Sequence, residues 1–445
     1  MPSFANALKY WFKLGWISFG GPAGQIAMMH DELVERRRWI CDSRFTHALN
    51  YCVVLPGPEA QQLATYIGWL MHGVRGGIAA GVLFVLPSLF ILLALAWVYT
   101  QYGQLPVISG VLAAVKPAIV AIILAAAWRI GSRTLRHPSL WAISIAAFIA
   151  VDVLKVPFPW IILAAAAMGT ILARFFPAIS GAGAHASGKR ADTGVSYLID
   201  EHHEPPPHAR FRLASSAVTL VMFVLLWASV LGLLYLLFGG WLTTAVQLAW
   251  FHTKAALLTF GGAYAVLPYV HQSAVNHYQW LSSAQMIDGL ALGESTPGPL
   301  IMVVTFVGYL AGWHQGLGLA ASLQPAAATL TAGVLGGVIA TFFTFLPSFL
   351  FILAGAPFIE GARHQVRLKA PLNGITAAVV GVIASLGVFL GIHVLYDATT
   401  SSPNLIAIAI AVVALLLQIR FKFSTVRTIA LAAVTGLALS LLPPQ

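Results

Sequence analysis

Long apolar segments separated by short polar ones run along almost the whole chain. Segments such as Gly76–Val98 and Ser215–Phe238 carry no charged residue, and about 20 apolar residues suffice for a helix to cross a hydrocarbon layer. The pattern predicts nine spanning helices, near 76–99, 107–128, 138–154, 158–175, 213–238, 330–356, 371–392, 404–419 and 427–442. The ten-residue alternating segments of a transmembrane barrel are missing, so the expected fold is an all-α polytopic membrane protein.

The second half of the chain repeats the first. A displacement of 241 residues aligns Phe19-Gly20-Gly21 with Phe260-Gly261-Gly262, and Pro56-Gly57-Pro58 with Pro297-Gly298-Pro299. Further on, Leu86-Pro87-Ser88 aligns with Leu346-Pro347-Ser348 at a displacement of 260, which indicates an insertion near 314–331. Such self-similarity favours a duplication. The expected organisation is a first copy at 1–178, a cytoplasmic linker at 179–212, a linking transmembrane helix at 213–239 and a second copy at 240–445.

The placement of basic residues predicts that the two copies are inverted in the membrane. Arg36–Arg38 and Arg44 follow the first Phe-Gly-Gly motif, whereas the equivalent stretch 277–285 contains no Lys or Arg. The bias then reverses twice, with basic residues in 362–369 but not in 99–106, and in 129–136 but not in 393–403. Because basic loops gather on the cytoplasmic face, these alternations favour inverted-topology repeats.

The four segments that carry the Phe-Gly-Gly and Pro-Gly-Pro motifs are apolar but interrupted. We expect re-entrant or discontinuous helices there, because exposed backbone is tolerated at membrane depth only where it lines a protein or water cavity. If these segments cross fully, the number of spans rises to eleven or more. A half-helix that begins at such a break points its free N–H groups at the gap, which favours an anion. Kinks or close helix crossings are the alternative, since Gly and Pro are common in membrane helices.

Polar residues near the breaks complete the candidate site. Lys13 and Lys254 precede the motif glycines by about two helical turns, and an intramembrane lysine indicates function by default, although each could instead snorkel to an interface. The predicted substrate-binding residues are Lys13, Ser18, Gly20, Gly21, Pro22, Pro56, Gly57, Pro58, Lys254, Thr259, Gly261, Gly262, Pro297, Gly298 and Pro299.

Two acidic residues beside the Pro-Gly-Pro motifs are candidates for proton coupling. Glu59 directly follows the first motif and Glu294 precedes the second, and buried carboxylates can carry protons across membranes. Neutralisation of a nearby cation is an equally open role. Lys116 is matched by Thr376 in the second copy, so snorkelling or packing is expected for it. Further hydrogen-bond donors to an oxyanion are expected from Gln61, Gln62, Tyr66 and Thr305.

Composition excludes a water-soluble globule. Only 9% of residues are charged and 59% are hydrophobic, with a mean hydropathy of +0.85; soluble domains are about a quarter charged. The net charge of +10 comes from clusters between apolar segments, which indicates membrane orientation rather than nucleic-acid binding. Cys41 and Cys52 match neither a disulfide framework nor a metal site. The acidic and His-rich tract 200–208 lies in the Pro-rich linker, so we expect neither metal nor cofactor.

These motifs, their order and their duplication resemble the chromate ion transporter family, in its long two-domain form. The resemblance rests on Phe19–Pro22, Glu35–Trp39, Leu55–Pro58 and the two second-copy motifs. It implies a multi-pass carrier of the bacterial inner membrane that exports chromate, is driven by the proton gradient and confers chromate resistance, with sulfate as a structural mimic of the substrate. Ala263 replaces Pro22 in the second copy, so the first break need not have one shape in both halves.

The expected function is export of a tetrahedral oxyanion bound between the inverted copies. A carrier for sulfate or another oxyanion is an alternative within transport. A membrane-embedded enzyme is disfavoured because the chain lacks HExxH, GxSxG, Walker A and Rossmann motifs, and an occluded midplane site argues against a channel. The expected partners are the oxyanion and the lipid bilayer, without nucleic acid, and a homodimer is left open.

Overall fold

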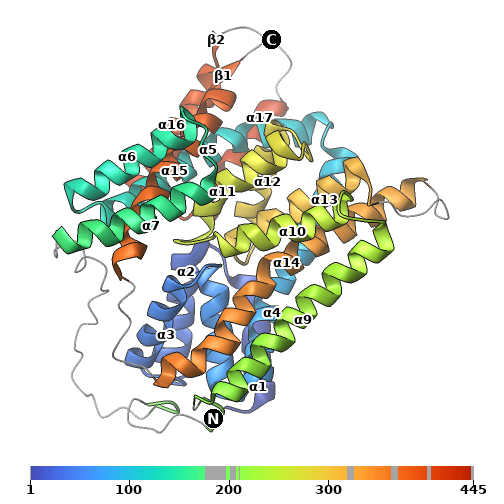
Figure 1. The fold of residues 1–445 in the computed structure, drawn as a ribbon. Coiled ribbons are helices and arrows are strands. Elements are labelled where there is room, and N and C mark those ends of the chain that lie inside the picture. The colour runs from blue at the N-terminus through green and yellow to red at the C-terminus, as the bar shows by residue number, and fades with distance from the viewer. Residues whose placement is uncertain are drawn as a thin grey trace.

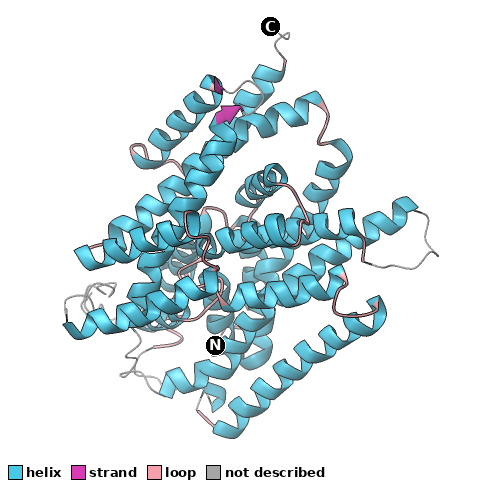
Figure 2. Ribbon diagram, turned by 45° about the horizontal axis from the view of Figure 1, so that its top comes forward, coloured by secondary structure: helices cyan, strands magenta, loops and turns pink. Residues whose placement is uncertain are grey.

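The structure is a computed structural model that describes residues 2–175, 197–200, 207–209, 211–317, 325–361, 369–397 and 402–441. Figure 2 shows helices throughout, and β1 (Tyr396–Asp397) and β2 (Ser402–Pro403) make one short antiparallel pair. Within the described chain, six helices are long and apolar enough to cross a membrane. They are α4 (Glu59–Tyr102), α5 (Pro106–Thr134), α7 (Phe158–Phe175), α9 (Leu213–Phe238), α14 (Pro325–Gly361) and α15 (Lys369–Leu395). The predicted all-α polytopic fold is confirmed.

Three expected spans form helices that are shorter than a full crossing. These are α6 (Pro138–Asp152), α16 (Leu405–Ile419) and α17 (Thr425–Ser440), with 15, 15 and 16 residues. At 1.5 Å per residue they reach about 22–24 Å, less than the roughly 30 Å hydrocarbon core. Left-handed residues follow two of them: Lys155, after α6, and Lys422, after α16, adopt positive φ angles of 53° each.

The remaining helices carry the interrupted segments, and both copies fold them alike. The first copy has α1 (Phe4–Ile17), α2 (Gly21–His30), a π-helix η1 (Asp31–Arg36) and α3 (Asp42–Val54). The second has α10 (Thr244–Leu257), α11 (Ala263–His271), a π-helix η3 (Gln272–His277), α12 (Ser283–Ser295), η4 (Leu300–Met302) and α13 (Val303–Gln315). Both π-helices, and the left-handed residues Arg38 and Gln279, are again 241 positions apart, so the duplication extends to unusual backbone geometry.

Helix α4 is a hairpin of two helices rather than one long rod. Its backbone leaves helical geometry at His72 and Gly73, and a Cβ on Gly68 would lie 2.5 Å from the carbonyl oxygen of Gly76. Only glycines permit this close antiparallel approach. In the second copy Gly308 of α13 packs equally closely on Ala340 of α14.

The two copies are interlocked rather than merely adjacent. Helix α15 of the second copy packs on α6 and α7 of the first, and α5 of the first packs on α16 and α17 of the second. Small residues allow these crossings: a Cβ on Gly169 would lie 2.8 Å from Gly374 Cα, and one on Gly436 would lie 2.8 Å from Ala114 Cβ. Figure 1 shows α15 lying against the α6–α7 pair.

Most of the predicted linker 179–212, including most of its His-rich tract, lies outside the described residues. Residues 197–200 of the linker lie beside Arg38–Cys41. Ile199 N–H donates to Trp39 O (3.1 Å), and Cys41 N–H donates to Ile199 O (3.0 Å). Near the linker's end, the Nε2 atom of His208 lies 2.9 Å from Trp69 O. The two described pieces of the linker, 197–200 and 207–209, are therefore hydrogen-bonded to the first copy.

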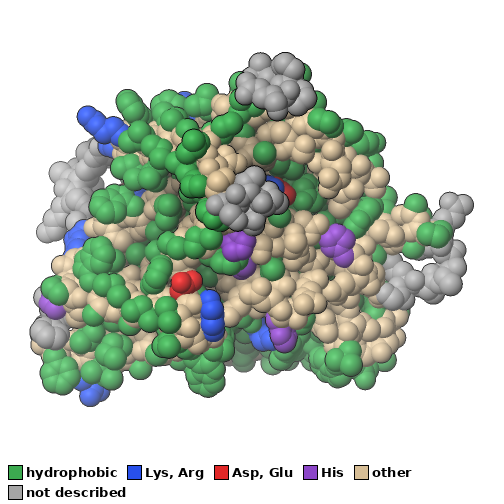
Figure 3. Space-filling view, turned by 90° about the horizontal axis from the view of Figure 1, so that it is seen from above, with side chains coloured by type: hydrophobic (Ala, Val, Ile, Leu, Met, Phe, Trp, Pro, Cys, Tyr) green, Lys and Arg blue, Asp and Glu red, His purple; other side chains and the backbone are tan. Residues whose placement is uncertain are grey.

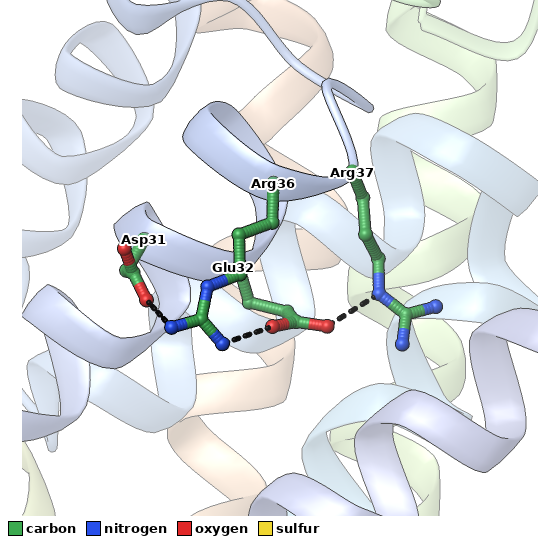
Figure 4. Close-up of polar contacts among 4 residues, drawn as sticks. All are labelled: Asp31, Glu32, Arg36 and Arg37. Carbon is green, nitrogen blue, oxygen red and sulfur yellow. Dashed lines mark hydrogen bonds and ion pairs between the residues drawn. The ribbon is translucent and has the colours of Figure 1, made fainter.

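The arginines at that end are paired with acidic neighbours. Figure 4 shows Arg36 between Asp31 and Glu32, at 3.1 and 3.6 Å, and Arg37 Nε at 2.7 Å from Glu32. Their side chains are between 25% and 69% exposed, so each pair stabilises the fold by only about 0–1 kcal/mol. On the opposite face, hydrophobic side chains are interspersed with other side chains and backbone, and charged side chains are few (Figure 3).

Candidate functional site

Each Pro-Gly-Pro motif forms the tip of a helical hairpin. In the first copy α3 leads to the tip and the 59–71 part of α4 leads away from it, and the two legs are joined by the Tyr51–Tyr66 ring contact (6.0 Å). In the second copy α12 and α13 form the corresponding legs. Figure 1 places α3 toward the lower end of the molecule and α12 toward the upper end, so the hairpins enter from opposite ends, as expected for inverted repeats.

Reciprocal hydrogen bonds join each hairpin tip to the Phe-Gly-Gly break of the other copy. Gly57 N–H donates to Thr259 O (2.7 Å), and Gly298 N–H donates to Ser18 O (2.9 Å). Ser18 and Thr259 follow the last residues of α1 and α10, where carbonyls lack a partner within the helix. Each Pro-Gly-Pro tip therefore meets the Phe-Gly-Gly break of the opposite copy, and these two contacts together form the junction of the copies.

The Leu-Pro-Ser helices hold the tips in place. A Cβ on Gly57 would collide with Ser348 Oγ, and a Cβ on Gly298 would collide with Ser88 Oγ. Ser88 Oγ also donates a hydrogen bond to Pro297 O. The glycines have φ angles of 131° and 100°, which residues with a side chain rarely adopt. Both conformation and space thus require glycine at these two positions.

The first-copy Phe-Gly-Gly glycines, in contrast, face open space, whereas Gly262 is buried and a Cβ on Gly261 would lie 3.9 Å from Val379 Cγ1. Gly20, Gly21, Gly261 and Gly262 all have positive φ angles, yet a Cβ on Gly20 or Gly21 would meet no atom within 4 Å. A Cβ on Gly262 would lie 4.0 Å from Glu59 Oε1. Helix α2 begins at Gly21 and α11 directly after Gly262, so first-turn N–H groups of both helices lie beside these glycines. Of these groups, Ala265 N–H donates to Gly262 O (3.1 Å). Pro22 lies in the first turn of α2, a position that proline tolerates.

Gln25 braces the first break. Its side chain is fully buried, and Nε2 donates to both Ser18 O (3.0 Å) and Gly298 O (2.5 Å). The second copy has Val266 at the equivalent position, so this brace exists on one side only. The sequence analysis missed Gln25; its signal was a single amide inside an otherwise apolar motif segment.

Gln25→Val is expected to destabilise the protein by about 1–3 kcal/mol, because two buried carbonyls lose a donor. The measurement is thermal unfolding of the purified protein in detergent. Gln104→Val, at an exposed position between α4 and α5, is the control and should leave the unfolding temperature unchanged. Equal unfolding temperatures for Gln25→Val and the wild type would contradict the bracing role.

The two predicted carboxylates lie in different settings. Glu59 starts α4 beside Gly262 of the other copy, whereas Glu294 is buried near the end of α12 and accepts a hydrogen bond from Tyr264 OH (2.6 Å). Glu59 therefore faces the junction of the copies, and Glu294 is held by a residue of its own copy.

Comparison with known proteins agrees with this architecture. A sequence model of the family described as "Chromate transporter" matches residues 5–170 and 246–437, one segment in each copy. The chain belongs to the chromate transporter family. It is 32% identical to the chromate transport protein of Pseudomonas aeruginosa over 86% of this chain and 80% of that protein. It is 29% identical to that of Cupriavidus metallidurans over 97% and 92%. No solved structure matches the chain.

In this member of the chromate transporter family, the two lysines predicted to bind the anion lie on α1 and α10. Lys13 is exposed on α1, and Lys254 is half-buried with Nζ 6.0 Å from the ring centroid of the exposed Trp250. Among the described residues, no hydrogen bond or ion pair joins either lysine to the breaks. This surface placement favours the alternative in which each ammonium group reaches toward an interface.

Several other predicted donors of this chromate transporter family member are already engaged within the protein. Gln62 Nε2 donates to Pro56 O (2.8 Å), Tyr66 OH donates to Glu360, and the hydroxyls of Thr305 and Thr341 lie 2.7 Å apart. Thr259 OH donates to Ala255 O (2.7 Å). Ser18 differs: its buried Oγ has no hydrogen-bond partner among the described residues, so it is available to a ligand at the break.

Proposed function

We propose that this protein exports chromate, a tetrahedral dianion, across the bacterial inner membrane and thereby confers chromate resistance. The observation that carries the proposal is the pair of reciprocal bonds, Gly57 to Thr259 and Gly298 to Ser18, which join each Pro-Gly-Pro tip to the Phe-Gly-Gly break of the opposite copy. The name "Chromate transport protein" borne by two relatives supports this substrate class.

The backbone at the junction suits an oxyanion. First-turn N–H groups of α2 and α11 lie beside the Phe-Gly-Gly glycines, and helix N-termini favour negative charge. In our proposal these groups and Ser18 Oγ bind the substrate oxygens. Because the donors are fixed before the anion arrives, little ordering is needed to replace its hydration shell.

The electrical part of the proton gradient supplies the driving force in this proposal. It makes the cell interior negative, and moving one charge through 100 mV releases about 2.3 kcal/mol. A dianion therefore gains about 4.6 kcal/mol per 100 mV on leaving the cell. Glu59, at the junction, is the proposed proton-binding group that links substrate binding to pH, and Glu294 is the second candidate.

Uptake of radiolabelled chromate into everted membrane vesicles tests the proposal. Energised vesicles should accumulate chromate, and an uncoupler should abolish the accumulation. Vesicles from cells without the protein are the control. No accumulation above that control, with or without the uncoupler, would refute the substrate assignment.

Sulfate is the second candidate substrate, because it matches chromate in shape and charge and the proposed donors contact only oxygen atoms. Competition kinetics separate the two. If chromate is preferred, sulfate should inhibit chromate uptake only in large excess. Inhibition by sulfate at concentrations below the chromate KM would instead assign the protein as a sulfate carrier.

Lys13→Ala and Lys254→Ala are expected to change the chromate KM by less than about twofold, since surface charges in water interact weakly over distance. The measurement is the same vesicle uptake over a range of chromate concentrations. An increase of about tenfold or more in KM, equivalent to 1.4 kcal/mol, would restore the prediction that these ammonium groups bind substrate.

A further inference from the structure

Two buried charged clusters link the copies outside the junction. The Glu360 cluster consists of Arg44, Tyr66 and Glu360: Tyr66 OH donates to Glu360 Oε1 (2.5 Å), and Arg44 Nη1 lies 3.7 Å from Glu360 Oε2. The Arg44 and Glu360 side chains are 5% and 3% exposed. These are charges removed from water, a state that persists only with compensating partners.

The Asp288 cluster consists of Tyr99, Lys116 and Asp288. Lys116 Nζ lies 3.1 Å from Asp288 Oδ1, and Tyr99 OH donates to Asp288 Oδ2 (2.9 Å). The Asp288 side chain is 6% exposed. Lys116 therefore neutralises a buried carboxylate, and the expected snorkelling is not seen.

Both clusters join the same kinds of element. The Glu360 cluster ties the first copy's hairpin, α3 and the 59–71 part of α4, to the long helix α14 of the second copy. The Asp288 cluster ties α12, a leg of the second copy's hairpin, to α4 and α5 of the first. Each cluster therefore spans the boundary that must part before its hairpin tip can be reached from that end.

The clusters lie at opposite ends of the path. Glu360 follows Ser348, which contacts the first hairpin tip, by about 18 Å along α14; Tyr99 follows Ser88, which contacts the second tip, by about 16 Å along α4. Because the copies are inverted, these two directions lead to opposite faces. The arginine-rich stretches around Glu360 and Arg44 indicate the cytoplasmic face for the Glu360 cluster.

We propose that the Glu360 cluster is the cytoplasmic gate and the Asp288 cluster the outer gate of the transport path, each closing access to the junction by pinning one hairpin to the opposite copy. Ionic contacts suit a gate because, once parted, their charges are stabilised by the entering water. The clusters are not equivalent in sequence: Asp288 aligns with His47, and Glu360 with Thr100. One gate can thus be weakened without altering the other.

Labelling of a cysteine at the junction tests the two gates separately. The reporter is Ser18→Cys, at a fully buried position, in a background where Cys41 and Cys52 are replaced by serine. A membrane-impermeant maleimide is applied to right-side-out or everted vesicles. Asp288→Asn should raise the labelling rate about tenfold or more from the outer face only, and Glu360→Gln should do so from the cytoplasmic face only.

Matched variants separate a gate from a merely structural contact. Asp31→Asn removes a charge from an exposed ion pair and should leave labelling unchanged at both faces. Lys116→Gln should reproduce Asp288→Asn, and the charge-exchanged double variant Lys116→Asp with Asp288→Lys should restore slow labelling. These two variants also decide the matter if Asp288→Asn does not reach the membrane.

Unchanged labelling, or a rise from both faces or from the wrong face, would overturn the gates. The inference rests on the proposed function, in which the junction binds the substrate and opens to each face in turn, but the labelling requires no substrate. Absence of chromate uptake with face-specific labelling would reject the substrate and keep the gates. Normal uptake without face-specific labelling would keep the substrate and reject the gates.

Discussion

Gly57→Ala and Gly298→Ala should each reduce oxyanion transport about 100-fold or more, because strain at positive φ and collision with a packed neighbour together reach about 3 kcal/mol. A methyl group on Gly57 would press on Ser348 Oγ and lie 2.6 Å from Gln62 Nε2, and one on Gly298 would lie 3.1 Å from Ser88 Cβ. Either substitution displaces a hairpin tip and its bond to the opposite copy. The measurement is initial uptake in everted vesicles, corrected for the amount of protein.

A graded set of variants distinguishes crowding from backbone strain. Gly20→Ala adds strain without collision, since no atom lies within 4 Å of the added carbon, so its loss should be smaller. Gly232→Ala, in α9 with open space around it, should transport normally. Ser348→Ala should partly rescue Gly57→Ala by making room. Wild-type rates for Gly57→Ala would contradict the tip geometry described here.

Glu59→Gln should remove the pH dependence of oxyanion binding. Charges of −2 and −1 separated by about 10 Å repel by about 3 kcal/mol at an effective dielectric constant near 20. A neutral Glu59 therefore favours the substrate, and deprotonation as the pH rises should increase the KM of the wild type. Glutamine mimics the protonated carboxyl, so the KM of the variant should stay low, about tenfold or more below the wild type at alkaline pH.

The KM ratio of wild type to variant is the quantity to compare across the neutral pH range, because protonation of the substrate itself cancels in that ratio. Glu294→Gln is the matched control: its carboxylate is held by Tyr264 within the second copy, and we expect its KM to follow the wild-type pH profile. Identical pH profiles for Glu59→Gln and the wild type would remove Glu59 from the coupling role. A flat profile for Glu294→Gln alone would assign that role to Glu294.

The breaks could be predicted from the sequence because glycine and proline act on their own backbone. Gly20, Gly57 and their counterparts require no knowledge of distant residues to mark interruptions, and the duplication indicates which interruptions correspond. The reciprocal bonds then follow from inversion: if one tip reaches the other copy's break, symmetry requires the second tip to do the same.

The side-chain chemistry was harder to predict, because it depends on contacts between distant segments. Tyr66 and Glu360 are 294 residues apart, and neither cluster has an equivalent in the repeat that would draw attention to it. Helical spacing placed Lys13 on the face of Gly20, but spacing alone does not show which face is covered, and Lys13 is exposed. The ends of α6, α16 and α17 lie within two residues of the predicted ones, because apolar composition alone marks these helices.

The exchange of packing partners between the copies has a consequence for biosynthesis. Helices α5, α6 and α7 leave the ribosome long before α15, α16 and α17, the segments against which they pack. The early half must therefore wait in the bilayer with its binding faces turned to lipid or to insertion factors. Packing of the first half is thus completed late. A nascent chain that stops before α17 leaves α5 without its partner and is a target for quality-control proteases, even when its first half is wild type.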